Sequence, residues 1–291
     1  MTRFPLSLIF SLIGSAVLTL GAAAQEQPQK IVSIGGGVTE TLYALGAQDR
    51  IVAVDTTSLY PQEALETKPN VGYMRALSAE GVLALSPDLI LMDGAAGPPE
   101  ALELLDQAKI RVVQVPSGHS ATELPEKIRR IAAAAGKTEE GAKLASEVET
   151  ELTGLEKDLQ RVTTKKRVLF ILSLTDGRPM AAGTDTGADT IIRMAGAENV
   201  FAEVKGYKTI SPEAAAALQP DAILMITRSG MPEEGKDILK EPAFVETPAA
   251  KAGAFIKMDS LFLLGFGPRT AQAARDLAAQ LYPDLGLKAV P

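Results

Sequence analysis

The chain of 291 residues has no cysteine, no tryptophan and a single histidine. Without cysteine it can form no disulfide, no thiolate metal site, no cysteine nucleophile and no lipid-modified N-terminal cysteine. One histidine cannot build a zinc cluster without cysteine. His119 also has no Ser or Asp partner nearby in the sequence that would indicate a catalytic triad. We interpret His119 as an exposed loop residue at the mouth of a helix, with a weak ligand role as the alternative.

Positive charge is scarce, with 29 basic against 36 acidic residues. At the start of the chain, Arg3 precedes an apolar run at residues 6–20, and three alanines end at Ala24. This pattern predicts a signal peptide, because the apolar run is too short to span a membrane comfortably. Its removal leaves a mature chain from Gln25 with 28 basic residues and a net charge of −8, which argues against a nucleic-acid partner. We expect a soluble periplasmic protein without a lipid anchor.

An internal repeat divides the chain. Residues 78–92 read SAEGVLALSPDLILM and residues 211–225 read SPEAAAALQPDAILM, with nine of fifteen positions identical. In each copy a serine can cap a short helix, a glutamate lies in the first turn, and a Pro-Asp pair stops the helix before a buried strand. Strand, loop and helix patterns precede both copies, in residues 30–47 and 167–197. The repeat therefore predicts two α/β lobes, each with a parallel sheet covered by helices.

A segment with helical periodicity separates the two halves. In residues 138–161, apolar residues recur at spacings of three and four. At about 1.5 Å per residue this helix measures ~36 Å, long enough to cross from one lobe to the other. We predict a signal peptide at 1–24, an N-terminal lobe at 25–137, an interlobe helix at 138–161 and a C-terminal lobe at 162–291. Ligands of open α/β sheets bind beyond the carboxyl ends of the strands, so we expect the site in the cleft between the lobes.

The loop Gly35-Gly36-Gly37 lies between a predicted strand and a predicted helix, which is the setting of a dinucleotide-binding motif. Asp55 even follows at the spacing of the acid that binds a ribose. However, Glu40 occupies the place of the third glycine. We therefore favour a tight turn at the edge of the cleft over a nucleotide site.

Residues 71–75 read VGYMR and directly precede the first repeat helix. A tyrosine on such a loop can be a packing lid or a ligand to ferric iron. Iron competes strongly for the hard phenol oxygen of Tyr73, and Arg75 can stabilise the resulting anion. Tyrosine is a known axial ligand of haem iron. Both interpretations of Tyr73 remain open on the residues alone.

Four stretches are similar to the haem-binding periplasmic proteins of haem ABC importers. They read GYMRALSAEGVLALSPDLIL, GRPMAAGTDTGADTIIRMAGAENV, GYKTISPEAAAALQPDAILM and LLGFGPRTAQAARDLA. The resemblance covers nearly all of the mature chain, in order. The surrounding superfamily also binds vitamin B12 and ferric siderophores, so the fold alone does not identify the cargo. Gly-Tyr-x-Arg before Leu-Ser-x-Glu-Gly is the feature that indicates haem.

The resemblance implies a helical-backbone periplasmic binding protein, not an enzyme, that carries haem to an ABC transporter permease with its ATPase. An outer-membrane haem receptor system would act upstream, and we expect a monomer. Tyr73 corresponds to the axial tyrosine, Arg75 to the arginine that assists it, and Arg228 to an arginine facing the cleft from the other lobe. Glu80 and Glu213 correspond to two acids that dock into arginine pockets on the permease. Their equivalent places suit a two-fold partner, although both could be solvent-facing helix caps.

One departure concerns the number of haems. Some members hold a second haem through a histidine just after the first strand of the second lobe, but residues 172–177 contain none. Tyr207 follows Gly206 as Tyr73 follows Gly72, so Tyr207 could line the cleft or face a second haem. We expect one haem.

Two other functions remain as alternatives. The first is a ferric-siderophore or vitamin B12 carrier, against which the absence of tryptophan counts mildly, since planar ligands often stack on such rings. The second is an exported hydrolase. It is opposed by the lack of a Gly-x-Ser-x-Gly motif and of a nucleophile–base pair.

Overall fold

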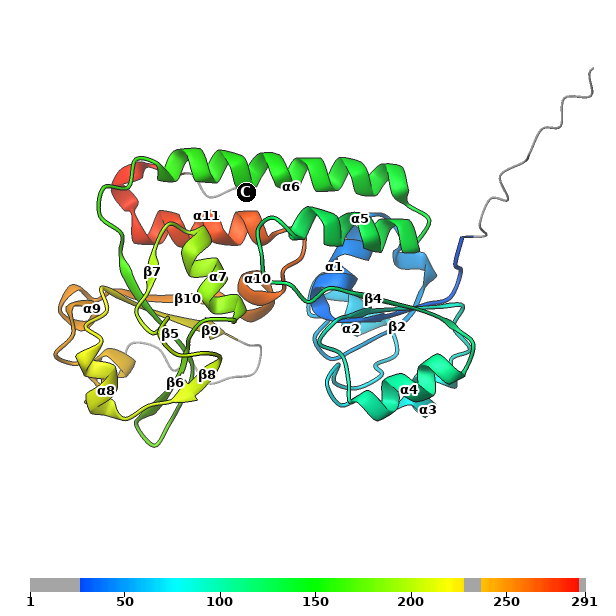
Figure 1. Ribbon diagram of the computed structural model, residues 1–291, viewed down its shortest axis with the longest axis horizontal. Helices are drawn as coiled ribbons and strands as arrows, with labels where there is room; N and C mark the ends of the chain where they lie inside the picture. The colour runs from blue at the N-terminus through cyan, green and yellow to red at the C-terminus, as the bar shows by residue number, and fades with distance from the viewer. Residues whose placement is uncertain (1–26, 228–236, 288–291) are drawn as a thin grey trace, which may run out of the picture.

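The computed structural model describes residues 27–227 and 237–287 (Figure 1). The predicted signal peptide at 1–24 and the predicted cleft residue Arg228 lie outside the described residues. Two β-sheets, each with its own helices, lie side by side along one long helix, α6 (Thr138–Leu159) (Figure 1). The predicted fold class of two α/β lobes joined by a long helix is therefore confirmed.

The N-terminal lobe contains a sheet of four parallel strands in the order β2-β1-β3-β4. Its strands are β1 (Ile31–Ile34), β2 (Ile51–Val54), β3 (Leu89–Asp93) and β4 (Arg111–Val115). Its helices are α1 (Gly36–Ala44), η1 (Gln48–Arg50), α2 (Glu63–Thr67), α3 (Ala79–Leu83), α4 (Pro99–Gln107) and α5 (Leu124–Ala134). Alternate residues of β1 and β3 enter two separate cores, one on each face, as expected for a sheet covered on both sides.

The C-terminal lobe contains a mixed sheet in the order β10-β9-β5-β6-β8, with β7 paired to β5. Its strands are β5 (Arg167–Thr175), β6 (Arg178–Ala182), β7 (Glu198–Asn199), β8 (Tyr207–Thr209), β9 (Ala222–Thr227) and β10 (Phe255–Asp259). Its helices are α7 (Gly187–Met194), α8 (Pro212–Ala217), η2 (Asp237–Lys240), α9 (Pro248–Ala252), α10 (Ser260–Leu264), α11 (Thr270–Leu281) and η3 (Pro283–Leu285).

This second sheet differs from the expectation of parallel strands alone, because β6 is antiparallel to both β5 and β8. The cause is the two-residue turn between β5 and β6. Asp176 and Gly177 have φ values of 51° and 69°, and positive φ at both central residues is typical of a type I′ hairpin turn. The parallel part of the sheet, β10-β9-β5, matches the prediction.

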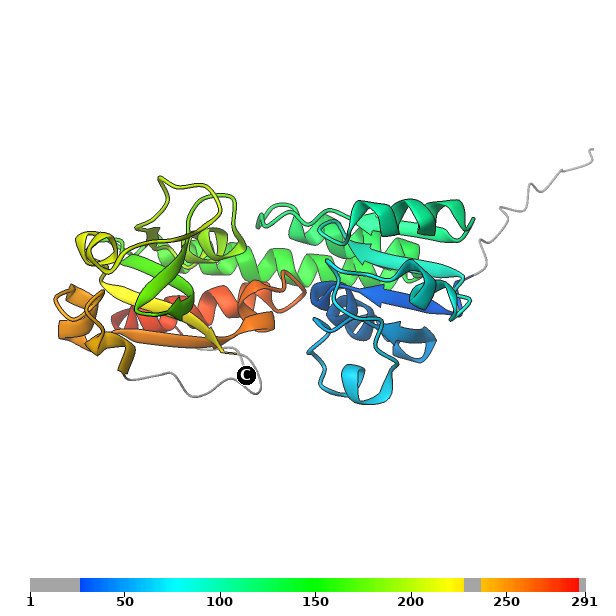
Figure 2. The ribbon, with the colours of Figure 1, turned by 90° about the horizontal axis from the view of Figure 1, so that it is seen from below.

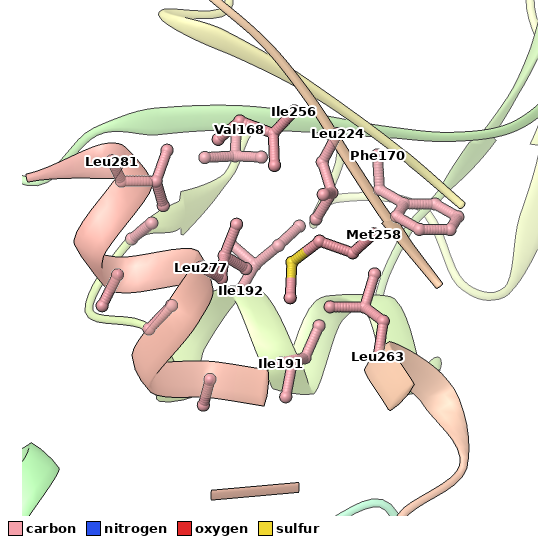
Figure 3. Packing of buried hydrophobic residues seen from close by; sticks show 14 of the residues in the cluster. Val168, Phe170, Ile191, Ile192, Leu224, Ile256, Met258, Leu263, Leu277 and Leu281 are labelled. Carbon is pink, nitrogen blue, oxygen red and sulfur yellow. The ribbon is translucent and has the colours of Figure 1, made fainter. Parts of the chain in front are cut away.

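The largest core of this lobe lies between its sheet and the helices α7 and α11 (Figure 3). Phe170 of β5 and Leu224 of β9 enter it from the sheet, and Ile191 of α7 and Leu277 of α11 meet them. All four side chains are fully buried. The sheet and its helices therefore form one packed unit that holds the loops at the strand ends in place.

The helix α6 has 22 residues and is therefore about 33 Å long. Val148 packs in a cluster with α5 of the N-terminal lobe, whereas Leu155 belongs to the core of the C-terminal lobe. Arg275 of α11 also donates to Asp158 of α6, with an Nη1–Oδ2 distance of 2.8 Å. One continuous helix thus packs against both lobes, and Figure 1 shows it running along both of them.

The serines at the start of the two sequence repeats cap their helices in the same way. Ser78 Oγ accepts a hydrogen bond from the Gly81 N–H at 3.2 Å, before α3. Ser211 Oγ accepts one from the Ala214 N–H at 3.2 Å, before α8. Each bond satisfies a donor that the first turn of a helix leaves unpaired.

The aspartates of the two Pro-Asp pairs fix the beginning of the central strands. Asp88 Oδ1 accepts from the Lys30 N–H at 3.0 Å, directly before β1. Asp221 Oδ2 accepts from the Arg167 N–H at 2.9 Å, at the start of β5. The repeat in the sequence therefore corresponds to a repeat in structure.

Seen from below, the parallel strands of both sheets run toward the junction between the lobes (Figure 2). The loops at their carboxyl ends consequently face the junction. This is the place where open α/β sheets bind ligands.

Candidate ligand-binding cleft

Tyr73 and Arg75 lie in the loop that leads into α3. Gly72 has φ of 92°, a value that glycine adopts without strain, and its N–H donates to Asn70 Oδ1 at 2.7 Å. Met74 is buried in the core beneath the loop. Its two neighbours therefore face outward, and Tyr73 is 43% exposed.

The two outward side chains are in contact, because Arg75 Nη1 donates to Tyr73 Oη at 2.9 Å. Arginine is a donor only, so the phenol oxygen is the acceptor. The guanidinium therefore places a positive charge directly beside the phenol oxygen. The remaining lone pairs of Tyr73 stay available to a hard cation such as ferric iron. The structure thus brings together the two residues that the sequence singled out.

Tyr207 lies in the other lobe, at the start of β8, after Gly206 with φ of 75°. Its side chain is 38% exposed. Burial raises the pKa of the Tyr207 phenol, and the positive charge of Arg75 lowers it in part. This interaction brings Arg75 into electrostatic range of a phenol from each lobe. The Tyr207 phenol is neutral at pH 7, since its pKa is raised from an ordinary value of 10.

His119 lies in the loop between β4 and α5 and is exposed, as expected from its position in the sequence. One face of its ring is nevertheless covered by Phe266 of the C-terminal lobe, with 4.7 Å between the ring centroids. Burial lowers the pKa of His119, and the charge of Lys127 lowers it further. Arg75 acts in the same direction. The charge of Arg75 therefore acts on His119 as well as on Tyr207.

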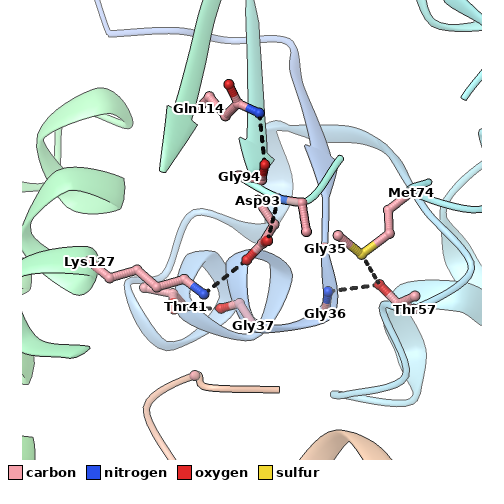
Figure 4. A network of polar contacts seen from close by, with 12 residues as sticks. Gly35, Gly36, Gly37, Thr41, Thr57, Met74, Asp93, Gly94, Gln114 and Lys127 are labelled. Carbon is pink, nitrogen blue, oxygen red and sulfur yellow. Dashed lines mark hydrogen bonds and ion pairs between the residues drawn. The ribbon is translucent and has the colours of Figure 1, made fainter. Parts of the chain in front are cut away.

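The glycine loop after β1 forms a turn in which two N–H groups are already paired, and Figure 4 shows the pairing of Gly36. Gly35 has φ of 107°, and its N–H donates to Asp55 Oδ1 at 2.8 Å. The Gly36 N–H donates to Thr57 Oγ1 at 2.9 Å. Protein groups thus occupy two of the donors that a dinucleotide phosphate would need, which favours the structural turn that we expected.

Glu80 and Glu213 occupy the second position of α3 and of α8, and both are exposed. A hydrogen bond from its own N–H lowers the pKa of Glu213, and one with the Ser211 side chain lowers it further. Glu213 therefore also stabilises the first turn of its helix. The capping and docking interpretations of this residue are thus compatible.

Three residues that the sequence did not single out contact the opposite lobe. Phe266 covers His119. Arg269 lies over the ring of Tyr60, with its guanidinium carbon 3.4 Å from the centroid. Phe266 and Arg269 both belong to the stretch LLGFGPRTAQAARDLA, which was noted only for its resemblance. For Tyr60, the sequence offered no indication of an interlobe contact beyond its aromatic side chain.

A groove of about 830 Å³ also follows α6, between α7 and the start of α5. Leu152 and Leu159 contribute apolar surface to it, and His119 lies at its edge. Tyr73, Arg75 and Tyr207 do not line it. The groove is therefore separate from the tyrosine pair.

Among residues 27–227 and 237–287, no group of three or more His, Cys, Asp or Glu side chains is placed to hold a metal ion. In the same part of the chain, no helix is long and apolar enough to cross a membrane.

The chain belongs to the periplasmic binding protein family, whose sequence profile matches residues 31–261. This is a family of solute-binding proteins and not a family of enzymes.

Several solved structures of heme-binding proteins are similar to this chain. The periplasmic heme-binding protein RhuT from Roseiflexus sp. RS-1 is 38% identical, with a TM-score of 0.82, over 88% of this chain and 99% of that one. The heme-binding protein BhuT, solved with two hemes, is 37% identical with the same TM-score of 0.82, over 88% of this chain and 98% of its own. A periplasmic heme-binding protein from Pseudomonas aeruginosa is 34% identical, with a TM-score of 0.81, over 91% and 95% of the two chains. This chain is therefore structurally similar to heme-binding members.

Curated sequence relatives point to the wider superfamily. An uncharacterized ABC transporter substrate-binding lipoprotein, YvrC of Bacillus subtilis, is 28% identical over 89% of this chain and 82% of its own. A vitamin B12-binding protein of Pectobacterium carotovorum is 27% identical over 91% of this chain and 92% of its own. Both carriers belong to the same general class as the solved structures.

Proposed function

We propose that this protein binds haem in the cleft between its lobes, with Tyr73 as the ligand to ferric iron, and delivers it to an ABC importer. The observation that carries the proposal is the 2.9 Å hydrogen bond from Arg75 Nη1 to Tyr73 Oη on an exposed loop. A phenol oxygen held by a cation is prepared to act as an anionic iron ligand. The similarity to heme-binding structures at 34–38% identity supports the same cargo.

Arg75 and Tyr207 complete the site in this proposal. Arg75 stabilises the tyrosinate, and its charge also reaches Tyr207 across the junction. Tyr207, with its neutral phenol, lines the cleft from the C-terminal lobe. Arg228 follows β9 directly. It remains a predicted second cleft arginine, outside the described residues.

The carrier role also requires a surface for the permease and its ATPase. Glu80 and Glu213 are exposed at equivalent positions of α3 and α8, one on each lobe. Opposite charges across such an interface steer the encounter and fix its orientation. We propose that the two acids dock on arginines of the permease. We further propose a mature monomer in the periplasm, produced by removal of residues 1–24, with an outer-membrane haem receptor system as its source.

Vitamin B12 is the second candidate cargo, because curated relatives over most of the chain bind it. A ferric siderophore is the third candidate within the same transporter class. Cobalamin already carries its metal ligands, so it gains little from a tyrosinate. The Tyr73–Arg75 pair therefore favours haem.

The purified mature chain, titrated separately with hemin and with cyanocobalamin, tests this proposal. Hemin should bind with a shifted absorption band, and excess cyanocobalamin should not displace it. Tight binding of cyanocobalamin with no binding of hemin would instead make the protein a B12 carrier. Binding of neither would leave the siderophore class.

A further inference from the structure

The loop Gly265–Arg269, which joins α10 to α11 in the C-terminal lobe, reaches into the N-terminal lobe. We propose that it locks the two lobes at a fixed separation and that Glu40 and Arg269 are positioning residues that set the width of the cleft. The proposal concerns the chain itself and applies to any cargo.

The polar part of this lock is a buried carboxylate. Glu40 of α1 is only 4% exposed. Its Oε1 accepts from the Arg269 N–H at 3.1 Å, and its Oε2 accepts from Arg269 Nη2 at 2.9 Å. Both oxygens of a residue in one lobe are thus bound by one residue of the other. Separating the lobes would break both of these hydrogen bonds at once.

An aromatic stack adds a second interlobe contact. The Arg269 guanidinium lies 3.4 Å from the ring centroid of Tyr60 in the N-terminal lobe and 5.2 Å from that of Phe262 in its own lobe. A guanidinium over an aromatic face is attracted by the ring. Arg269 therefore bridges the lobes through its charge and through its flat surface.

Backbone packing closes the same junction. A Cβ added to Gly37 would overlap the carbonyl oxygen of Gly265, and a Cβ added to Gly36 would overlap Leu261. Phe266 has φ of 48°, a left-handed conformation that is costly for a bulky residue. This conformation presents its ring to His119 of the other lobe.

Two connections of this kind restrict the lobes more than α6 alone. A single helix could act as a hinge at its middle. The loop Gly265–Arg269 holds the lobes together at a second place, so that rocking about α6 would break the buried Glu40–Arg269 pair. The loop Gly265–Arg269 therefore fixes the separation of the lobes before any cargo binds.

Distance measurement between the lobes tests the lock without any cargo. The chain has no cysteine, so Leu104→Cys with Val245→Cys supplies the only two thiols for spin labels. Both positions are exposed, at 54% and 45%, and lie in opposite lobes. The parent should give one narrow distance distribution. Glu40→Ala should raise the population at altered separations about tenfold, which corresponds to ~1.4 kcal/mol of lost interlobe stabilisation. Glu40→Gln, which keeps an acceptor for the Arg269 N–H, should have a smaller effect.

The matched control is Glu149→Ala, which removes an exposed ion pair to Arg129 instead of the buried one. It should leave the distribution unchanged. Tyr60→Leu removes only the stack at an exposed residue, and it serves as the test if Glu40→Ala does not fold by circular dichroism. Distributions identical to the parent in the Glu40 variants that fold and in Tyr60→Leu would overturn the lock. Altered distances in Glu149→Ala would show that the effect is not specific to the junction.

Discussion

The loops that precede α3 and α8 both begin with Gly-Tyr and then diverge. In the N-terminal lobe, Gly72-Tyr73 is followed by Arg75, which donates to the phenol at 2.9 Å. In the C-terminal lobe, Gly206-Tyr207 is followed by Thr209 at the same spacing. Tyr207 therefore lacks an arginine in its own loop and senses the charge of Arg75 across the junction.

The helices that follow these loops remain equivalent. Ser78 and Ser211 cap them with the same bond length of 3.2 Å, and Glu80 and Glu213 take the same place in the first turn. The elements proposed for folding and docking are thus duplicated, whereas the proposed metal ligand is confined to one lobe. A symmetric outer surface with an asymmetric site suits a carrier that meets a two-fold partner while holding one cargo.

The largest expected effect is a loss of transport when the two equivalent acids at the starts of α3 and α8 are removed. The double variant Glu80→Ala/Glu213→Ala should bind hemin like the parent but fail to support haem uptake or to stimulate the transporter ATPase in vesicles. Each single variant should lose part of the activity, because charge pairs on both lobes set the orientation of docking.

The matched control for docking is Glu103→Ala/Glu246→Ala, which removes one exposed acid from each lobe elsewhere on the surface. It should transport normally. Full transport by the Glu80/Glu213 variant would leave both residues as helix caps only.

A smaller effect, on hemin affinity, is expected from Arg75→Ala in the tyrosine loop of the N-terminal lobe. A hydrogen bond to a charged group is worth about 1.5–3 kcal/mol, so hemin affinity should fall by about tenfold or more. Loss of the cation makes the tyrosinate easier to protonate. Acid should therefore dissociate the ferric complex at a higher pH than in the parent, as an absorption titration would show. Lys208→Ala, which removes an exposed cation beside Tyr207, should change neither quantity.

The two serine caps should contribute equally to stability. Ser78→Ala and Ser211→Ala should each lower the free energy of unfolding by about 1 kcal/mol in urea denaturation. Ser146→Ala, at an exposed position inside α6, should change it by less than about 0.5 kcal/mol. Unequal effects of the two caps would show that the lobes differ in more than their tyrosine loops.

The smallest expected effect is a shift in the titration of His119. It is the single histidine of the chain, so its NMR signal is unambiguous. Its pKa is lowered from 6.5, first by burial and then by Lys127, so its titration should be centred below that value. Phe266→Ala uncovers the ring and should move the midpoint upward. The unfolded chain binds a proton at His119 more readily than the folded chain does. The free energy of unfolding should therefore decrease as the pH falls through the ordinary histidine range. A parent midpoint at or above 6.5 would contradict the packed ring.

Much of this architecture could be predicted because it rests on local patterns. The repeat of Ser, Glu and Pro-Asp predicted both helix caps and both buried strands, and leucine spacing predicted α6. Asp176-Gly177 was a readable hairpin signal that the expectation of parallel strands overlooked. The interlobe contacts of Arg269 and Phe266 had no local pattern, since their partners Glu40 and His119 are more than a hundred residues away.

The central claim is that one phenol, Tyr73, binds the iron of the cargo, and affinities for hemin and for metal-free protoporphyrin test it directly. Tyr73→Phe keeps the ring and removes the oxygen. This variant should lower the affinity for hemin about a hundredfold, equivalent to ~2.7 kcal/mol. Its affinity for protoporphyrin should be unchanged. Tyr207→Phe, the matched change in the other lobe, should affect the two ligands equally and slightly. Hemin binding by Tyr73→Phe with the affinity and spectrum of the parent would contradict the account.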